Sequence, residues 1–434
     1  MNIRAIAAKT LAPVVAQKES LNTAIPKGLK RVNERDRGLF QQLCYGTMRF
    51  YPRLNRLAST LLKKPFKQHD LDLHALLLLG LYQLLEMRIP HHASIGETVE
   101  ACTDLDKQWA KSPVNAILRR MQREQNSLFE QLQDDPEFRF NHPSWMINKL
   151  RHNWPDHWQQ ILEQNNQQPP MTLRINPLQT DRDSYLQLLD DAGIEAAACP
   201  YSAVAIQLQQ PCDVEMLPGF YEGWASVQDE AAQLSAYLLD LQTGQRVLDA
   251  CAAPGGKLCH ILEHEPGLQQ VTAIELEEKR ASRIHENLQR LELCAEILVA
   301  DAASSDWWDG HYFDRILVDA PCSASGVIRR NPDIKHLRRS EDLKALANIQ
   351  LEILQNCWQM LAPGGKLVYA TCSIFPQENE RVVERFIKLQ HDANHQPIDA
   401  TWGIERPVGR QLFPQASGHD GFYYALLTKD HEQA

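Results

Sequence analysis

Asp249-Ala-Cys-Ala-Ala-Pro-Gly-Gly-Lys257-Leu258 is a turn of small residues between a predicted strand and a predicted helix. The apolar run Arg246-Val247-Leu248 before it predicts a short buried strand, and Leu258-Cys-His-Ile-Leu262 after it predicts the first turns of a helix. Glycine allows a ligand to approach the backbone closely, and the N–H groups at a helix N-terminus face that ligand. We therefore expect this turn to cradle a cofactor.

Short apolar segments alternate with helical patterns from residue 236 onward, which predicts an α/β Rossmann-like domain with a doubly wound, mostly parallel sheet over 236–434. The expected strands are Arg246–Ala250, Gln270–Glu275, Glu296–Ala300, Arg315–Asp319, Lys366–Thr371 and Phe422–Leu427. The expected helices between them include Glu278–Leu291 and Asp342–Leu361. Ligands of such sheets bind beyond the carboxyl ends of the strands, so we expect the functional residues there.

The first 140 residues predict an all-α bundle with its own core. Apolar residues recur at helical spacing over Leu71–Met87, Ile95–Leu105 and Pro113–Met121. Glycines and prolines such as Pro26-Lys-Gly28 and Pro52 are expected between helices, where helices end.

A small α+β subdomain is predicted to link the two parts over residues 141–235. The segments Met171–Pro177 and Ala203–Leu208 predict strands, and Asp183–Ala192 predicts a helix.

Composition indicates an ordinary globular protein. The chain has 434 residues, of which 44% are hydrophobic and 23% charged, and no apolar run reaches the ~20 residues of a membrane span. Met1–Lys9 lacks the apolar core of a signal peptide. The ten cysteines include no Cys-x-x-Cys pair, which favours a reduced cytoplasmic protein without a metal site.

Charge is distributed unevenly along the chain. Residues 1–67 contain 14 basic and 3 acidic side chains, a net charge of +11, whereas residues 151–434 have a net charge of −17. A basic segment is typical of proteins that bind a polyanion, and a solvated helical surface is the alternative.

The cofactor predicted for the turn is S-adenosylmethionine. A P-loop would have Gly at position 251 and Ser or Thr at 258, where this chain has Cys251 and Leu258, and the dinucleotide pattern Gly-x-Gly-x-x-Gly is absent. Glu275 ends the second strand, where it suits ribose hydroxyls, and Asp301 follows the third, near an adenine amino group. A nucleoside that carries a sulfonium charge suits such an acidic pocket. The predicted cofactor contacts are Cys251, Ala252, Ala253, Pro254, Gly255, Gly256, Lys257, Glu275, Asp301 and Asp319.

Two cysteines follow strands at the same edge. Cys322 comes after the fourth strand in Asp319-Ala-Pro-Cys, and Cys372 after the fifth in Thr-Cys-Ser. A thiolate that adds to C6 of cytosine makes C5 nucleophilic enough to accept a methyl group. Asp319 is the expected partner of the N3/N4 edge of that base. Seven of the other eight cysteines are assigned to backbone contact or packing, namely Cys44, Cys102, Cys199, Cys251, Cys259, Cys294 and Cys357.

The motifs together resemble those of the RNA (cytosine-5)-methyltransferases. Asp249–Lys257, Asp319–Ser323 and Thr371–Ser373 look like motifs I, IV and VI, and Gly326–Lys335 and Gly418–Tyr424 match too. Leu173–Pro177 and Ser226–Glu230 also match, and Asp36–Phe40, Leu43–Gly46 and Val114–Arg120 resemble the NusB-like helical domain. This combination, over essentially the whole chain, is similar to the Fmu/Sun (RsmB) group of 16S ribosomal RNA methyltransferases.

The resemblance implies the roles of the two cysteines. Cys372 would be the nucleophile and Cys322 would assist release, although the Pro-Cys motif of DNA cytosine methyltransferases favours Cys322 by spacing alone. Two residues depart from the family pattern: Glu275 stands where Asp is common, and Leu258 where Thr is common. The role of Lys257 stays open between the cofactor carboxylate and the target base.

The resemblance also implies a substrate. It is cytosine 967 of 16S rRNA, free or in an early assembly intermediate, methylated by a monomer. Methylation of tRNA or DNA, or a non-catalytic RNA-binding factor, remain the alternatives. The predicted RNA contacts lie in the basic N-terminal segment and just after Cys322: Arg31, Arg35, Arg37, Arg49, Arg329, Arg330 and Lys335.

Overall fold

The computed structural model describes residues 1–431 and divides into two compact units. The helical unit contains residues 1–168 together with 328–340, and the second unit contains residues 169–327 and 341–434. The segment that follows the Cys322 loop therefore belongs to the helical unit, and residues 141–168, expected in the linking subdomain, belong to it as well.

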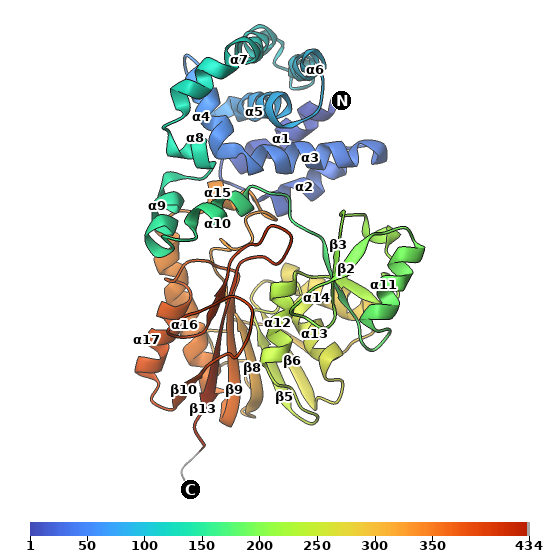
Figure 1. Ribbon diagram of the computed structural model, residues 1–434, viewed down its shortest axis with the longest axis vertical. Helices are drawn as coiled ribbons and strands as arrows, with labels where there is room; N and C mark the ends of the chain where they lie inside the picture. The colour runs from blue at the N-terminus through green and yellow to red at the C-terminus, as the bar shows by residue number, and fades with distance from the viewer. Residues whose placement is uncertain (432–434) are drawn as a thin grey trace. The chain divides into compact units, whose positions relative to one another are not determined.

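The helical unit is built from α-helices, and α1 to α8 share an apolar core (Figure 1). Its helices are α1 (Ile3–Val15), α2 (Leu21–Leu29), α3 (Arg37–Arg49), α4 (Tyr51–Leu61), α5 (Leu71–Glu86), α6 (His91–Asp104), α7 (Lys111–Leu132), α8 (Pro136–Phe140), α9 (Ser144–Asn153), α10 (Trp158–Asn165) and the short α15 (Ile334–Leu337). Helix α5 is apolar on nearly every side, with Leu76, Leu77, Leu78 and Leu79 fully buried. A helix with this pattern forms the centre of a bundle.

The predicted bundle is confirmed, but two of its expected breaks are wrong. Pro26 and Gly28 lie inside α2, and Pro52 lies in the first turn of α4, where proline is well tolerated. Gly28 is required by close packing, because a Cβ atom there would lie 2.5 Å from Cζ of Phe40. Helix α7 extends to Leu132, but it is kinked at Glu124 (φ −111°, ψ 15°), three residues after the expected end at Met121, and Leu128 and Leu132 beyond the kink are buried.

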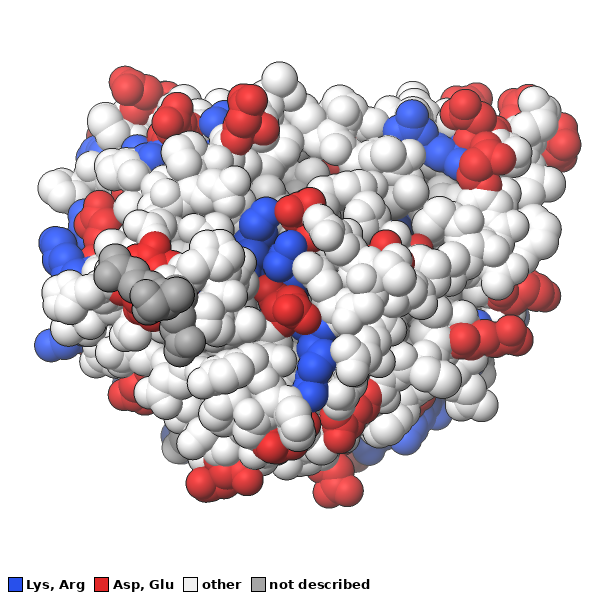
Figure 2. Space-filling view, turned by 90° about the horizontal axis from the view of Figure 1, so that it is seen from below, with Lys and Arg blue, Asp and Glu red and all other residues white. Residues whose placement is uncertain are grey.

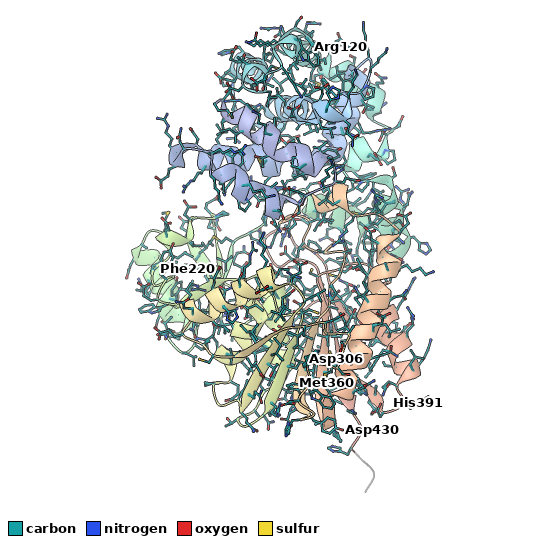
Figure 3. The ribbon with its side chains drawn as sticks, turned by 180° about the vertical axis from the view of Figure 1, so that it is seen from behind. Arg120, Phe220, Asp306, Met360, His391 and Asp430 are labelled. Carbon is teal, nitrogen blue, oxygen red and sulfur yellow. The ribbon has the colours of Figure 1, made fainter. Side chains whose placement is uncertain are left out.

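The second unit starts with a small antiparallel sheet in the order β2-β3-β1-β4. Its elements are β1 (Thr172–Ile175), α11 (Arg182–Asp191), β2 (Ala196–Ala198), β3 (Ala205–Leu208) and β4 (Ala225–Val227). Arg290 of a later helix joins this sheet to the rest of the unit, with its guanidinium 4.5 Å from the ring centroid of Phe220. Phe220 is labelled in Figure 3.

The large sheet has the order β11-β12-β13-β9-β8-β5-β6-β7, with β10 paired to β13. Its strands are β5 (Arg246–Ala250), β6 (Gln270–Glu275), β7 (Glu296–Val299), β8 (Phe313–Asp319), β9 (Leu361–Thr371), β10 (Ala393–Gln396), β11 (Ile404–Glu405), β12 (Arg410–Leu412) and β13 (Phe422–Lys429). Strands β5 to β9 pair in parallel, and β10 to β13 add antiparallel strands at one side. The expected doubly wound, mostly parallel sheet is confirmed.

Helices cover both faces of this sheet. One face packs against α16 (Asp342–Gln359) and α17 (Glu380–Leu389), and the other packs against α12 (Glu230–Leu238), α13 (Gly256–His264) and α14 (Glu278–Arg290) (Figure 1). Figure 3 labels Asp306 and Met360, which precede β8 and β9, toward the lower end of the sheet. The carboxyl ends of the parallel strands, with the predicted functional residues, lie at the opposite edge.

Charge at the surface is mixed in sign. Figure 2, which views the molecule from below, shows acidic and basic groups around the edge of this face and a short central row in which basic and acidic side chains alternate.

None of the helices within residues 1–431 combines the length and apolar character that a bilayer crossing needs.

Candidate active site

The turn after β5 has the backbone of a ligand cradle. Cys251 has φ of 64° and Gly255, the N-cap of α13, has φ of 98°. A Cβ atom on Gly255 would lie 3.3 Å from Cα of Ile284, so both the conformation and the available space favour glycine there. The side chain of Glu275 at the end of β6 accepts a hydrogen bond from Ala253 N–H at 3.3 Å, which joins the turn to the next strand.

Substitution of Gly255 by valine is expected to weaken binding of S-adenosylmethionine at least tenfold. The β-branched side chain disfavours positive φ, at a cost of about 1–3 kcal/mol, and pushes α14 away from the turn. Isothermal titration calorimetry with the cofactor measures the change. The matched control is Gly310→Val. Gly310 too has a positive φ, of +83°, but it has open space around it. The control therefore introduces the backbone strain without the steric clash. Equal affinity of Gly255→Val and the wild type would contradict this account.

Buried carboxyl groups line the edge beside the turn. Asp249 is fully buried, and neither of its carboxyl oxygens has a hydrogen-bond partner within residues 1–431. Burial, followed by the charges of Asp319 and Glu275, raises the pKa of Asp249 well above its usual value. Glu275 is buried too and forms an ion pair with Arg280 at 3.2 Å.

These residues fit S-adenosylmethionine, because its sulfonium and ammonium groups are cations that a buried carboxyl group can accept. Asp301 is exposed just after β7, where its carboxylate accepts a hydrogen bond from Ala303 N–H at 2.9 Å. Its expected contact with adenine stays a prediction.

A buried ion pair supports the cradle from behind. The guanidinium of Arg174 on β1 donates to both carboxylate oxygens of Glu263 on α13, each at 2.7 Å. It also donates to the side chain of Gln228 and to the carbonyl of Gly256, again at 2.7 Å. Arg174 therefore holds the small sheet and the first turn of α13 together. The segment Leu173–Pro177, which contains Arg174, matched a family motif in the sequence. The residues beside Arg174 in the chain do not indicate that it pairs with Glu263.

The two predicted cysteines meet at the ends of β8 and β9. The Sγ atoms of Cys322 and Cys372 lie 3.4 Å apart. The hydrogen bond to Cys372, followed by burial, raises the pKa of the Cys322 thiol well above its usual value. Cys322 therefore keeps its proton and can donate it in a hydrogen bond to the sulfur of Cys372.

Lys257 lies beside this pair. Its ammonium donates to the carboxylate of Asp319 at 2.6 Å and lies 5.2 Å from the ring centroid of Phe422. Burial alone would lower the pKa of Lys257, but Asp319 outweighs it and the pKa is raised. A charged Lys257 thus orients the Asp319 carboxylate at the edge that carries both cysteines.

A network of buried polar side chains holds the two cysteine loops, and the sequence analysis missed it. Glu378 accepts hydrogen bonds from Ser323 and Ser373, each the residue after a cysteine. Asn379 donates to the carbonyl of Ser373 and to Gln411 on β12. No sequence pattern marks these residues, because each acts on partners that are distant in the chain or in an irregular loop.

The prediction that Cys294 packs in the interior is wrong. Its side chain is exposed, whereas Cys44, Cys102, Cys199, Cys259 and Cys357 are buried. The residue lies in the irregular link between α14 and β7, outside the apolar core.

Three of the predicted RNA contacts are wrongly placed for that role. Arg31, Arg35 and Arg37 are exposed and Arg330 is partly exposed, but Arg49, Arg329 and Lys335 are buried in the helical unit. Arg49 donates to the carbonyl of Arg329 at 2.7 Å, and Lys335 donates to the carbonyls of Arg49 and Asn141. Arg49 and Lys335 therefore fix the 328–340 segment through buried hydrogen bonds to protein oxygens instead of facing solvent.

Lys335→Met is expected to destabilise the helical unit by about 2 kcal/mol, because Asn141 loses a buried hydrogen-bond partner. Burial and then the nearby charges of Arg49 and Arg53 lower the pKa of Lys335 well below 10.5. Between this folded-state pKa and 10.5 the unfolded chain binds more protons, so the stability of the wild type rises with pH in that window. Urea unfolding at several alkaline pH values measures this effect. The free energy of unfolding should rise with pH in the wild type and in the control Lys30→Met, whose lysine is exposed, and the rise should be lost in Lys335→Met.

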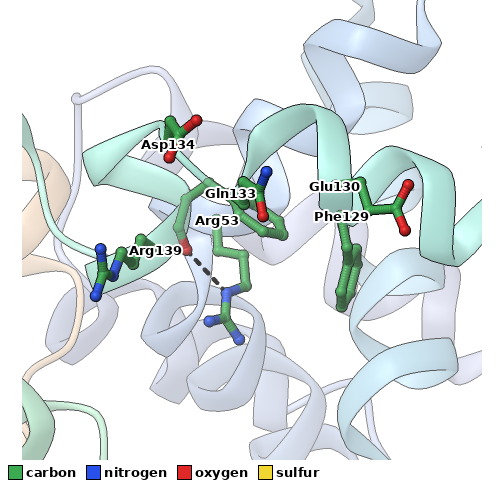
Figure 4. A pocket seen from close by; sticks show the side chains of 7 residues that line it. Arg53, Phe129, Glu130, Gln133, Asp134 and Arg139 are labelled. Carbon is green, nitrogen blue, oxygen red and sulfur yellow. Dashed lines mark hydrogen bonds between the residues drawn. The ribbon is translucent and has the colours of Figure 1, made fainter.

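The helical unit also has an open hollow of about 510 Å³ (Figure 4). Arg53 and Arg139 line it together with Glu130 and Asp134, and Arg53 donates to the carbonyl of Phe138 at 3.0 Å. Its opposing charges balance, so the hollow does not resemble a phosphate site.

Comparison with known families agrees with both units. Residues 236–428 match the family described as 16S rRNA methyltransferase RsmB/F, residues 142–215 match its ferredoxin-like domain, and residues 1–123 match the NusB family. The solved structure of PH0851 shares the fold over 99% of both chains, with a TM-score of 0.83 at 22% identity.

Similar full-length sequences carry one name. The chain is 54% identical over 430 residues to ribosomal RNA small subunit methyltransferase B of Pseudomonas putida, with 99% of both chains covered. It is 49% identical to the protein of that name from Vibrio cholerae, over 99% of this chain and 98% of the relative. The chain therefore belongs to the RsmB family of 16S rRNA methyltransferases, which use S-adenosylmethionine as methyl donor.

Proposed function

We propose that the chain methylates C5 of a cytosine in 16S rRNA, cytosine 967, through a covalent bond between Cys372 and C6 of the base. The observation that carries this proposal is the pair of thiols, 3.4 Å apart, at the strand edge that also bears the glycine cradle. Cytosine C5 methylation needs a thiol nucleophile at such an edge, whereas methylation of an amino group or a ribose hydroxyl does not.

The chemistry proceeds in two stages. The Cys372 thiolate forms a bond to C6, and the electron pair displaced to C5 forms a bond to the methyl carbon while the carbon–sulfur bond of the sulfonium breaks. A base then removes the C5 proton, the C6–Sγ bond breaks, and Cys372 leaves as a thiolate.

The other residues support these stages. The hydrogen bond from Cys322 stabilises the sulfur of Cys372 as it attacks and as it leaves. Asp319, oriented by Lys257, accepts a hydrogen bond from the cytosine amino group. S-adenosylmethionine supplies an electrophilic methyl group, and Gly255, Glu275 and Asp249 hold it at the turn.

RNA recognition in this proposal uses the exposed arginines of the helical unit. Arg31, Arg35 and Arg37 contact phosphate groups, and the target base leaves its stack to reach Cys372. The division into an RNA-binding part (1–140), a linking part (141–235) and a catalytic part (236–434) belongs to this proposal. So does action as a cytoplasmic monomer on free 16S rRNA or an early assembly intermediate.

Transfer of a labelled methyl group to three substrates tests the proposed function. Unmodified 16S rRNA, unmodified tRNA and duplex DNA are incubated with the protein and the labelled cofactor, and the modified nucleotide is mapped. The proposal predicts 5-methylcytosine at position 967 of 16S rRNA and none in tRNA or DNA. Exclusive transfer to tRNA or DNA, or transfer to a base position other than C5, would overturn it.

A further inference from the structure

One buried carboxylate joins the two loops that carry the cysteines. Glu378 is fully buried, and its Oε1 accepts a hydrogen bond from Ser323 N–H at 2.7 Å. Its Oε2 accepts from the hydroxyl groups of Ser323 and Ser373, each at 2.6 Å. Ser323 directly follows Cys322, and Ser373 directly follows Cys372. A single side chain therefore contacts the residue next to each thiol.

The position of this carboxylate is itself fixed by neighbours. Its backbone carbonyl accepts a hydrogen bond from the hydroxyl of Tyr369 at 2.7 Å, and its N–H donates to the carbonyl of Phe375 at 2.9 Å. Gln350 on α16 donates to its Oε1 at 3.3 Å. Within residues 1–431 no Lys or Arg forms an ion pair with Glu378, so the serines and Gln350 are its partners in place of a cation.

A buried carboxylate without a cation is costly, and burial accordingly raises the pKa of Glu378. Other hydrogen bonds also link the two loops. Gly326 N–H donates to the carbonyl of Cys372, Ile374 N–H donates to the hydroxyl of Ser325, and the hydroxyl oxygens of Ser325 and Ser373 lie 3.1 Å apart. The specific effect of Glu378 is to draw Ser323 and Ser373 onto the same oxygen atom.

We propose that Glu378 is a positioning residue that sets the spacing of Cys322 and Cys372 by tying Ser323 and Ser373 to one carboxylate. The consequence for catalysis rests on the proposed function, but the spacing itself does not. Loss of the tie lets the thiols separate, and Cys372 then loses the hydrogen bond from Cys322. A displacement of about 1 Å at a reacting group lowers a rate by about 10²-fold.

Three substitutions separate this role from general stabilisation. Glu378→Gln keeps an oxygen for Ser323 N–H and an amide group for the serine hydroxyl groups. Glu378→Asp is one carbon shorter and cannot reach both loops, and Glu378→Ala removes the tie. The matched control is Glu380→Gln, because Glu380 is a buried carboxylate two residues away that pairs with Arg406 and does not contact either cysteine loop.

Disulfide trapping measures the spacing without RNA. Diamide takes up the two protons and two electrons that leave when Cys322 and Cys372 form a disulfide, and mass spectrometry quantifies the linked peptides. We expect wild type, Glu378→Gln and Glu380→Gln to form the bond at similar rates, and Glu378→Asp and Glu378→Ala to form it at least tenfold more slowly. Equal rates in all five proteins would overturn the proposal, and Glu378→Asp decides the matter if Glu378→Ala fails to fold.

Steady-state kinetics measures the consequence for methyl transfer. For Glu378→Asp we expect kcat to fall about 10²-fold, with KM for RNA and Kd for S-adenosylmethionine within threefold of wild type, and recovery in Glu378→Gln. A parallel loss of cofactor binding, or no recovery with Gln, would indicate a structural role and overturn the proposal. If the trapping rates differ as expected while no variant or wild type methylates 16S rRNA, the proposed function fails and the positioning role stands.

Discussion

Replacement of Cys372 by alanine is expected to lower methyl transfer by at least about 10³-fold and to abolish covalent attachment of RNA. The reason is chemical: without a thiolate at C6, cytosine C5 has no route to sufficient nucleophilicity, and removing a nucleophile costs several orders of magnitude in rate. Methyl transfer to 16S rRNA and adducts resolved on a denaturing gel measure the two effects. Binding of S-adenosylmethionine should stay within threefold of wild type, because Cys372 is not part of the glycine turn.

Cys322→Ala is the informative partner of that variant. It should still form the bond between Cys372 and C6 but release it slowly, because the leaving sulfur loses the hydrogen bond that now spans 3.4 Å. Adduct should therefore accumulate. If Cys322→Ala is instead the variant without adduct, the roles of the two cysteines are reversed, as in the Pro-Cys motif of DNA methyltransferases.

Arg174→Met is expected to lower the free energy of unfolding by about 3–5 kcal/mol. Arg174 and Glu263 are both fully buried, and removal of one partner leaves an uncompensated charge in the interior. The carbonyl of Gly256 also loses a donor, so S-adenosylmethionine should bind more weakly. Denaturant unfolding followed by a probe of the second unit measures the change.

Two comparisons sharpen that prediction. The double variant Arg174→Met/Glu263→Leu should recover much of the loss, because an apolar pair has no buried charge to compensate. Lys366→Met is the control, since its partner Asp240 is largely exposed and such pairs contribute only about 0–1 kcal/mol. A loss below 1 kcal/mol in Arg174→Met would contradict the supporting role of this ion pair.

The local sequence pattern was sufficient to predict those elements whose structure depends on residues close together in the chain. The apolar run Arg246–Ala250 and the small-residue turn after it fold as expected, because both depend on nearby residues. The cysteines could be placed together because the carboxyl ends of parallel strands share an edge. In the large sheet, strands β10, β11 and β12 were missed, because Ala393–Gln396 is polar and Ile404–Glu405 and Arg410–Leu412 are too short to show a period.

The predictions that failed concern residues whose hydrogen-bond partners are distant in the sequence. Lys335 was predicted to bind RNA because it lies in a basic cluster, yet oxygens from Arg49 and Asn141 surround its ammonium. Glu378 resembles an ordinary loop acid, yet it accepts hydrogen bonds from a loop 55 residues earlier. Charge and residue type did not distinguish a buried side chain that links two segments from a solvated surface group, because burial depends on how the whole chain packs.

The most direct test of the central claim is to identify the cysteine that bonds to the RNA. A 16S rRNA fragment with 5-fluorocytidine at the target position retains its C6–sulfur bond, because fluorine cannot leave C5 as a proton does. Wild-type protein with S-adenosylmethionine and this RNA is digested, and the nucleotide-linked peptide is sequenced by mass spectrometry. The account predicts a methylated nucleotide on the peptide that contains Cys372. Linkage to Cys322, or no linkage to any cysteine, would contradict it.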